Sequence, residues 1–146
     1  MGSISFDKNI LYILTILEII EKLKIYSAND DNADNFFHTQ NRMPFHASCH
    51  LLLAIGEESK KISEALKDDF SFIQWERIAA IRNRIAHDYR GIDPEIVFAI
   101  IKNELDILKE AMIRMLHLQN LSGEKLKELL QSDYYEHIGY LLSENQ

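Results

Sequence analysis

WERIAAIRNRIAHDYRGID, residues 75–93, is the stretch that decides the fold we expect for this chain. Ile78, Ile81 and Ile85 recur at intervals of three and four residues, which is the spacing of side chains on one face of an α-helix. The stretch therefore predicts a helix over about residues 73–89, with its apolar face turned toward a core.

The end of the stretch predicts a short turn into another helix. Gly91 is a typical residue after the last turn of a helix. Asp93 and Pro94 are a typical start, because the aspartate accepts a hydrogen bond from a free backbone N–H and the proline has no N–H to leave unpaired. The two helices are therefore antiparallel neighbours, or they meet at a sharp corner.

The rest of the chain has the same helical spacing and few glycines or prolines. Residues 27–43 hold three Asp and four Asn, and they predict a loop or a ragged helix. In the first helix we place Glu18 off the apolar stripe, which consists of Ile10, Ile13, Leu14, Leu17, Ile20 and Leu23. We expect an all-α, up-and-down bundle of four core helices plus a C-terminal helix. The predicted helices are about Asp7–Tyr26, Pro44–Lys67, Ile73–Tyr89, Pro94–Leu118 and Glu124–Leu142.

Length and composition limit the class of protein. A chain of 146 residues that is 47% apolar suits one domain, so we expect a single domain over 1–146, with 120–146 as a C-terminal helical extension. The single Cys49 excludes an internal disulfide and is typical of a reducing compartment. The apolar run Ile10–Ile20 is too short to cross a bilayer and does not have the pattern of a secretory signal. We therefore expect a cytoplasmic protein with no membrane partner.

The charge is acidic overall and basic in one place. The net charge of −7 argues against a nonspecific coat on nucleic acid, DNA included, because such binding needs clustered Lys and Arg. Residues 82–90, however, hold three Arg and one Asp, a local charge of +2. A small phosphate-binding site is therefore compatible with the acidic chain.

Arg82 occupies an unusual position in the predicted helix. At about 100° per residue, Arg82 and Tyr89 fall on the apolar face with Ile85, while His87 points the opposite way. Arginine is rarely buried unless it is paired or lies at an interface. The plainer alternative is that Arg84, His87 and Arg90 only compensate the helix dipole, but this does not explain Arg82.

The spacing of Arg82, His87 and Tyr89 resembles the Rx4HxY motif of the HEPN superfamily, specifically its HepT-like branch. The branch is paired with minimal nucleotidyltransferase (MNT) antitoxins. The resemblance covers about Asp7 to Met115, and it includes Ile55-Gly56-Glu57-Glu58, Trp75 and Gly91-Ile92-Asp93.

This resemblance implies a function. Proteins of this branch are helical homodimers whose motifs meet across a two-fold axis, and they act as metal-independent endoribonuclease toxins without a cofactor. Arg82 and His87 are then the catalytic residues. In the proposed chemistry the RNA 2′-OH is the nucleophile, His87 moves protons and Arg82 stabilises the charged phosphorane. Tyr89 is the residue to which the partner nucleotidyltransferase transfers AMP, which inactivates the toxin of this type VII-like pair.

Supporting roles follow for neighbouring residues. We expect Asn83 and Arg84 to contact phosphate and Asp88 to tune the local charge. The resemblance also places Glu57 at the dimer cleft, where it contacts the motif of the same or the other chain. An ordinary solvated or ion-paired glutamate is the alternative for Glu57.

Several of these residues also allow a plainer interpretation. Tyr89 could instead cap the core at the end of its helix. His46, Cys49 and His50 have a spacing that can hold a metal, but no fourth ligand completes a site, so we expect a partly exposed helix face and no metal. His137 has no evident partner. The rival function is a noncatalytic helical module that binds a nucleotidyltransferase and is modified by it.

Overall fold

The computed structural model describes residues 8–144, and every regular element in that range is helical. The all-α prediction is therefore confirmed. Asp7, the predicted start of the first helix, lies outside the described residues. The elements are α1 (Lys8–Ser27), α2 (Ala33–His38), η1 (Thr39–Arg42), α3 (Met43–Lys61), α4 (Glu64–Asp68), α5 (Trp75–His87), η2 (Tyr89–Gly91), α6 (Pro94–Asn103), α7 (Leu105–Leu118), α8 (Gly123–Leu129) and α9 (Leu141–Glu144).

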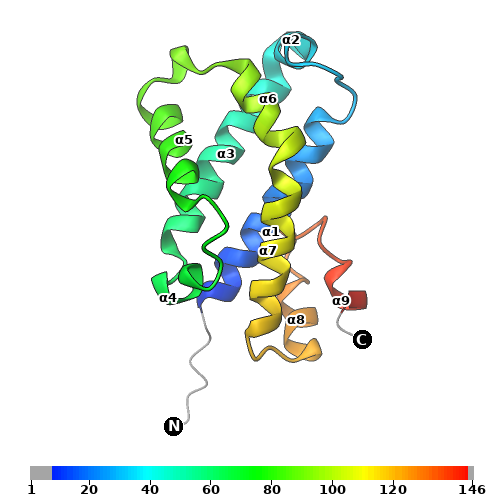
Figure 1. Ribbon diagram of the computed structural model, residues 1–146. Helices are drawn as coiled ribbons and strands as arrows, with labels where there is room; N and C mark the ends of the chain where they lie inside the picture. The colour runs from blue at the N-terminus through cyan, green and yellow to red at the C-terminus, as the bar shows by residue number, and fades with distance from the viewer. Residues whose placement is uncertain (1–7, 145–146) are drawn as a thin grey trace.

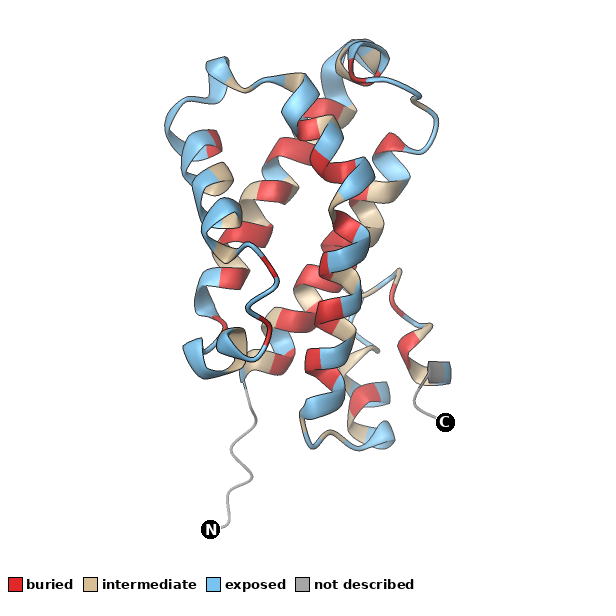
Figure 2. Cartoon of the chain, viewed as in Figure 1, coloured by how far each residue is buried: buried red, intermediate tan, exposed pale blue. Residues whose placement is uncertain are grey.

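Helix α1 is the central element of the bundle. It packs against α3 and against α7, and α3 packs in turn against α5 (Figure 1). All six residues of the predicted α1 stripe are buried, and so are Ile16 and Ile19 beside it. Buried residues gather where the helices face one another (Figure 2). Helix α1 is therefore covered on more than the one face that its sequence pattern predicts.

The expectation that Glu18 lies off the buried stripe is wrong, because Glu18 is fully buried. Its carboxylate accepts a hydrogen bond from the backbone N–H of His137 at 2.8 Å, and its second oxygen lies 2.5 Å from Nδ1 of the same residue. His137 therefore has a partner after all. Beside this contact, Tyr140 donates a hydrogen bond to Glu21 at 2.9 Å. Burial of the carboxylate is tolerated because its oxygens are paired.

The C-terminal segment does not form the predicted helix from Glu124 to Leu142. Helix α8 ends at Leu129, and the chain then follows turns to α9. The hydroxyl of Ser132 accepts a hydrogen bond from the N–H of Tyr134, a local bond that competes with the helical ladder. The segment instead packs over α1. There His137 donates a hydrogen bond to Glu18, and the neighbouring Ile138 is buried.

Two other predicted helices are divided by tertiary contacts. The helix predicted over 44–67 breaks at Ile62, which takes an extended backbone conformation and is buried. The helix predicted over 94–118 breaks at Glu104, whose carboxylate pairs with Arg77 at 2.9 Å. In both places contacts with other elements outweigh helix propensity, which is a weak preference.

Helix α5 ends two residues before its predicted end. It stops at His87, Asp88 leaves the helical conformation with φ −142° and ψ 59°, and Tyr89 begins η2. Gly91 does not take a left-handed conformation to end the helix. Glycine at this position instead leaves room for the side chain of Asp88, because a Cβ on Gly91 would lie 2.5 Å from Oδ2 of Asp88.

Two predicted helix starts are confirmed. The carboxylate of Asp93 accepts a hydrogen bond from the N–H of Glu95 at 2.9 Å at the start of α6. Pro44 lies in the first turn of α3, where its missing N–H costs nothing. The region predicted as a loop or ragged helix contains α2 and η1, and Asn32 caps α2. None of the helices between residues 8 and 144 is long and apolar enough to span a bilayer.

We expect Glu18→Ala to lower the free energy of unfolding by about 2 kcal/mol, because it leaves the partly buried donors of His137 without their acceptor and removes a carboxylate that is paired in the core. Urea unfolding measures the change, and hydrogen exchange should show faster exchange in residues 130–143. The control is Glu110→Ala, which removes an exposed ion pair with Arg114 and should change stability by less than about 0.5 kcal/mol. Equal effects of the two substitutions would contradict the role given to Glu18.

Candidate functional site

The close contact between α3 and α5 positions the motif. Gly56 is buried on α3 opposite Arg82 of α5. A Cβ on Gly56 would lie 2.7 Å from Cγ of Arg82 and closer still to its Cβ, so no other residue fits without displacing α5. Close packing against Arg82 is therefore the physical reason for a glycine at position 56. The sequence indicated this position only through its resemblance to the HepT-like branch.

Arg82 is held by Glu57 of the same chain. Its Nε donates a hydrogen bond to Oε1 of Glu57, and its Nη1 donates to the side-chain oxygen of Asn83 at 2.9 Å. Both members of the ion pair are partly buried. The contact expected between Glu57 and the motif is therefore present within one chain. It also accounts for an arginine close to the apolar face, because the charge is paired.

His87 points away from Arg82. The two residues lie five positions apart on α5, which is a rotation of about 140° around the helix axis. His87 is exposed, as are Arg84, Asp88 and Arg90. One chain therefore does not bring the two predicted catalytic side chains together on one face.

The expectation that Tyr89 shares a helix face with Arg82 is wrong, because the chain leaves the helix at Asp88. The Tyr89 hydroxyl is instead hydrogen-bonded to Nδ1 of His46 on α3. The two rings are stacked, with centroids 5.6 Å apart and an interplanar angle of 26°. Tyr89 is 43% exposed, so it does not cap the core. Sequence reasoning missed this pair, since no local pattern links residues 43 positions apart.

Burial and charge raise the pKa of the Tyr89 phenol. Burial of the ring is the larger cause, and the nearby Cys49 adds to it. Cys49 itself is buried in the core, which raises the pKa of its thiol to about 12. Both groups therefore stay protonated near neutral pH.

The three residues with metal-ligand spacing on α3 do not converge. Cys49 is buried, while His46 and His50 are exposed and His46 contacts Tyr89. Within residues 8–144, no three His, Cys, Asp or Glu side chains gather closely enough to hold a metal ion.

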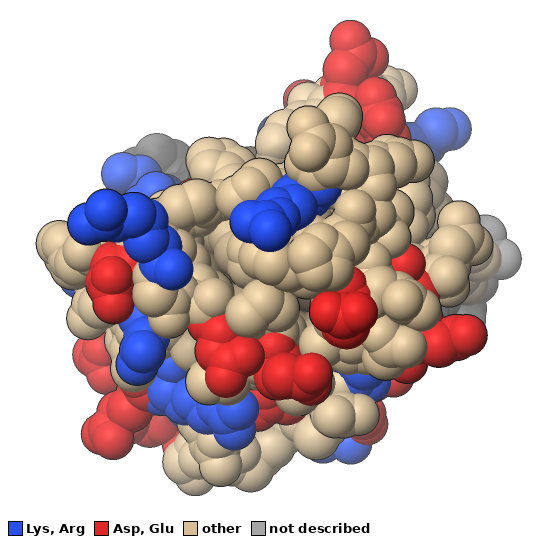
Figure 3. All heavy atoms as spheres, turned by 90° about the horizontal axis from the view of Figure 1, so that it is seen from above, with Lys and Arg blue, Asp and Glu red and all other residues tan. Residues whose placement is uncertain are grey.

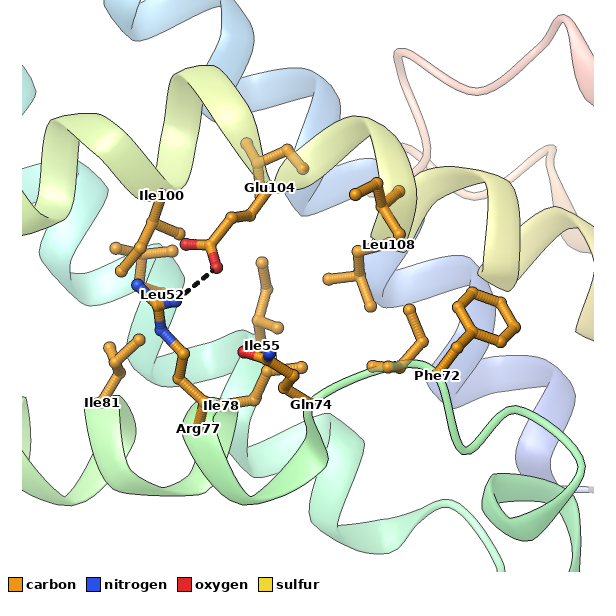
Figure 4. Close-up of a pocket in the computed structure, with 13 residues that line it drawn as sticks. Leu52, Ile55, Phe72, Gln74, Arg77, Ile78, Ile81, Ile100, Glu104 and Leu108 are labelled. Atoms are coloured by element: carbon orange, nitrogen blue, oxygen red, sulfur yellow. Dashed lines mark ion pairs between the residues drawn. The ribbon is translucent and has the colours of Figure 1, made fainter.

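A pocket of about 240 Å³ opens between α5, α3 and the α6–α7 pair. Figure 4 shows Arg77 of α5 reaching across it to Glu104, with apolar side chains around them. Arg82, His87 and Tyr89 do not line it. The pocket is thus a separate feature from the motif.

The end of the bundle where α5 stops shows mixed charge. Seen from that end, basic and acidic side chains lie in small neighbouring groups, and this face carries no continuous basic surface (Figure 3). Any phosphate contact here would therefore be local.

One protein-family model matches most of this chain. A family model described as "Ribonuclease HepT-like" matches residues 16–115, which include α3, α5 and the whole motif. The chain belongs to this family. The HepT-like resemblance of the sequence is therefore confirmed.

Several curated proteins are similar to this HepT-like chain. One, named "Gamma-glutamylcyclotransferase and putative RNase", from Methanocaldococcus jannaschii, is 26% identical over 106 residues, which is 73% of this chain and 46% of that protein. A second from the same organism, named "Putative RNase", is 30% identical over 70 residues, 48% of this chain and 64% of that protein.

A third protein of that organism has the same name and is 28% identical over 92 residues, 62% of this chain and 74% of that protein. The HepT-like chain spans less than two thirds of the length of the first two relatives. No solved structure gives a significant match to it.

We expect Gly56→Ala to destabilise the HepT-like bundle by about 1–3 kcal/mol, because the added methyl group overlaps Arg82 and must push α5 away from α3. Urea unfolding measures the loss. Gly123→Ala is the matched control, because nothing lies within 4 Å of a Cβ at that position. A harmless Gly56→Ala would show that the two helices do not depend on this contact.

Proposed function

We propose that this chain is a metal-independent endoribonuclease, the toxin of a type VII-like toxin–antitoxin pair. The observation that carries the proposal is the HepT-like match over the Rx4HxY motif. Arg82 of α5 is held by Glu57 of α3, and His87 is exposed at the end of α5. The names of its relatives as RNases support the same reaction.

In the proposed reaction the RNA 2′-OH attacks the adjacent phosphorus. His87 accepts the hydroxyl proton or protonates the departing 5′-oxygen, since an imidazole can do either near neutral pH. Arg82 stabilises the charge that develops on the phosphorane. Asn83 and Arg84 contact the phosphate, and Asp88 moderates the positive charge beside them. Glu57 fixes the guanidinium through Nε.

A homodimer completes this site. Since Arg82 and His87 point about 140° apart on one helix, a single chain does not direct both at one phosphate. A second copy related by a two-fold axis supplies the missing residue and doubles the local positive charge. The dimer is thus the assembly that makes the motif chemically complete.

In this proposal, modification of Tyr89 inactivates the ribonuclease. The partner is an MNT-type nucleotidyltransferase antitoxin that transfers AMP to the Tyr89 hydroxyl. Tyr89 is exposed enough to be reached. An adenylate at this position adds negative charge and bulk within the basic stretch of residues 82–90, so it opposes binding of an RNA phosphate.

We expect His87→Ala to reduce cleavage of a fluorescent RNA by about 100-fold or more, because general acid–base catalysis contributes about 10²–10⁴-fold. Arg82→Ala should cause a loss of similar size. His117→Ala and Arg114→Ala are the matched controls, since both residues are exposed on α7. If the unmodified protein and all four variants fail to cleave, the noncatalytic module is favoured instead.

A substrate in which the nucleotide 5′ to the cut lacks its 2′-OH should not be cleaved, because the nucleophile is missing. Addition of a chelator should leave cleavage of ordinary RNA unchanged. Gel electrophoresis of the products checks both. Undiminished cutting of the deoxy substrate would refute the proposed chemistry.

Mixing Arg82→Ala with His87→Ala tests the shared site. If one chain supplies the arginine and its partner the histidine, a mixed dimer keeps one intact site, and about a quarter of the wild-type rate returns on random exchange. If each site uses both residues of one chain, no activity returns. Exchange is verified by mass spectrometry of the intact dimer.

A further inference from the structure

The His46–Tyr89 contact joins the start of α3 to the end of the motif. The chain enters α3 through three successive residues with positive φ, Gln40, Asn41 and Arg42. Such a backbone is costly for residues other than glycine, so surrounding contacts must hold it. It places His46 in the first turn of α3, where the imidazole stacks on the Tyr89 ring and hydrogen-bonds its hydroxyl.

A protonated phenol is a poor nucleophile. A tyrosine hydroxyl keeps its proton near neutral pH, and burial raises the pKa of Tyr89 further. Transfer of a nucleotide to this oxygen therefore requires a group that removes the proton as the new bond forms.

Other titratable groups near Tyr89 are poorly suited to this task. The thiol of Cys49 has its pKa raised to about 12 by burial, so it holds its own proton. The carboxylate of Asp88 is turned toward Gly91, where its oxygen occupies the space that a Cβ would need. The imidazole of His46 is the group in direct contact with the hydroxyl.

We propose that His46 is the general base for modification of Tyr89. This inference rests on the proposed transfer of AMP to that residue. In the step, the Tyr89 oxygen forms a bond to the α-phosphorus of a nucleoside triphosphate, and the bond from that phosphorus to the bridging oxygen breaks. Pyrophosphate leaves with the electron pair, and the hydroxyl proton passes to Nδ1 of His46. Because His46 is exposed, the imidazole can release the proton to solvent.

The first test needs no partner protein. Phenylmethylsulfonyl fluoride attaches to tyrosine oxygen with loss of fluoride and a proton, so it reports the same activation. Peptide mass spectrometry measures the labelling rate at Tyr89 and at Tyr134, which is equally exposed at 44%. His46→Ala and His46→Asn are compared with the wild type. His50→Ala, one turn along α3 and also exposed, is the matched control.

We expect labelling of Tyr89 to slow by about tenfold or more in His46→Ala and His46→Asn, because asparagine can accept a hydrogen bond but cannot take up a proton. Labelling of Tyr134 and of the His50→Ala protein should not change, and added imidazole should restore His46→Ala. A wild-type rate at Tyr89 in either His46 variant overturns the inference. Equal thermal unfolding midpoints verify that the variants fold.

The second test uses coexpression with the MNT-type nucleotidyltransferase. AMP on Tyr89 of the wild type and of His50→Ala, with a tenfold or greater decrease in His46→Ala, supports the inference. Equal modification of His46→Ala overturns it and leaves the proposed function intact. If no AMP reaches wild-type Tyr89, the proposed modification is wrong, and the labelling rates still decide whether His46 activates the hydroxyl.

Discussion

The absence of a side chain at Gly56 is the constraint on which the candidate site depends. It lets α5 approach α3 so closely that Cβ and Cγ of Arg82 occupy the space where another residue would carry a side chain. The guanidinium then lies beside Glu57, the next residue on α3. At the other end of this helix pair, just beyond the last residue of α5, Tyr89 of η2 contacts His46 of α3.

Helix α3 therefore provides a partner for each end of the motif. Glu57 pairs with Arg82, and His46 contacts Tyr89, while His87 between them on the chain faces solvent. In the proposed function these contacts have different purposes. The first holds a cation for RNA phosphate, and the second prepares a hydroxyl for modification. Under that proposal, the group for cleavage and the group for modification have separate partners on α3, although the three motif residues lie within eight positions of one another.

The centre of the bundle is stabilised by a contact remote from the motif. Glu18 is buried in α1 and is paired by His137, so the C-terminal segment completes the cover of the helix against which α3 packs. This is why a carboxylate is tolerated between apolar neighbours of α1. The segment thus supports the site indirectly, through α1 and then α3.

Local patterns in the sequence determined the helical class, the buried stripe of α1, the cap at Asp93 and the family, because each depends on residues close together in the chain. Only the tertiary structure decided where helices break, as at Ile62 and Glu104, because contacts from distant elements outweigh helix propensity there. It also decided the partner of Glu18, the pairing of Glu57 with Arg82 of its own chain, and the partner of Tyr89. Those pairs join residues 119, 25 and 43 positions apart, and periodicity along one helix contains no information about what lies opposite it.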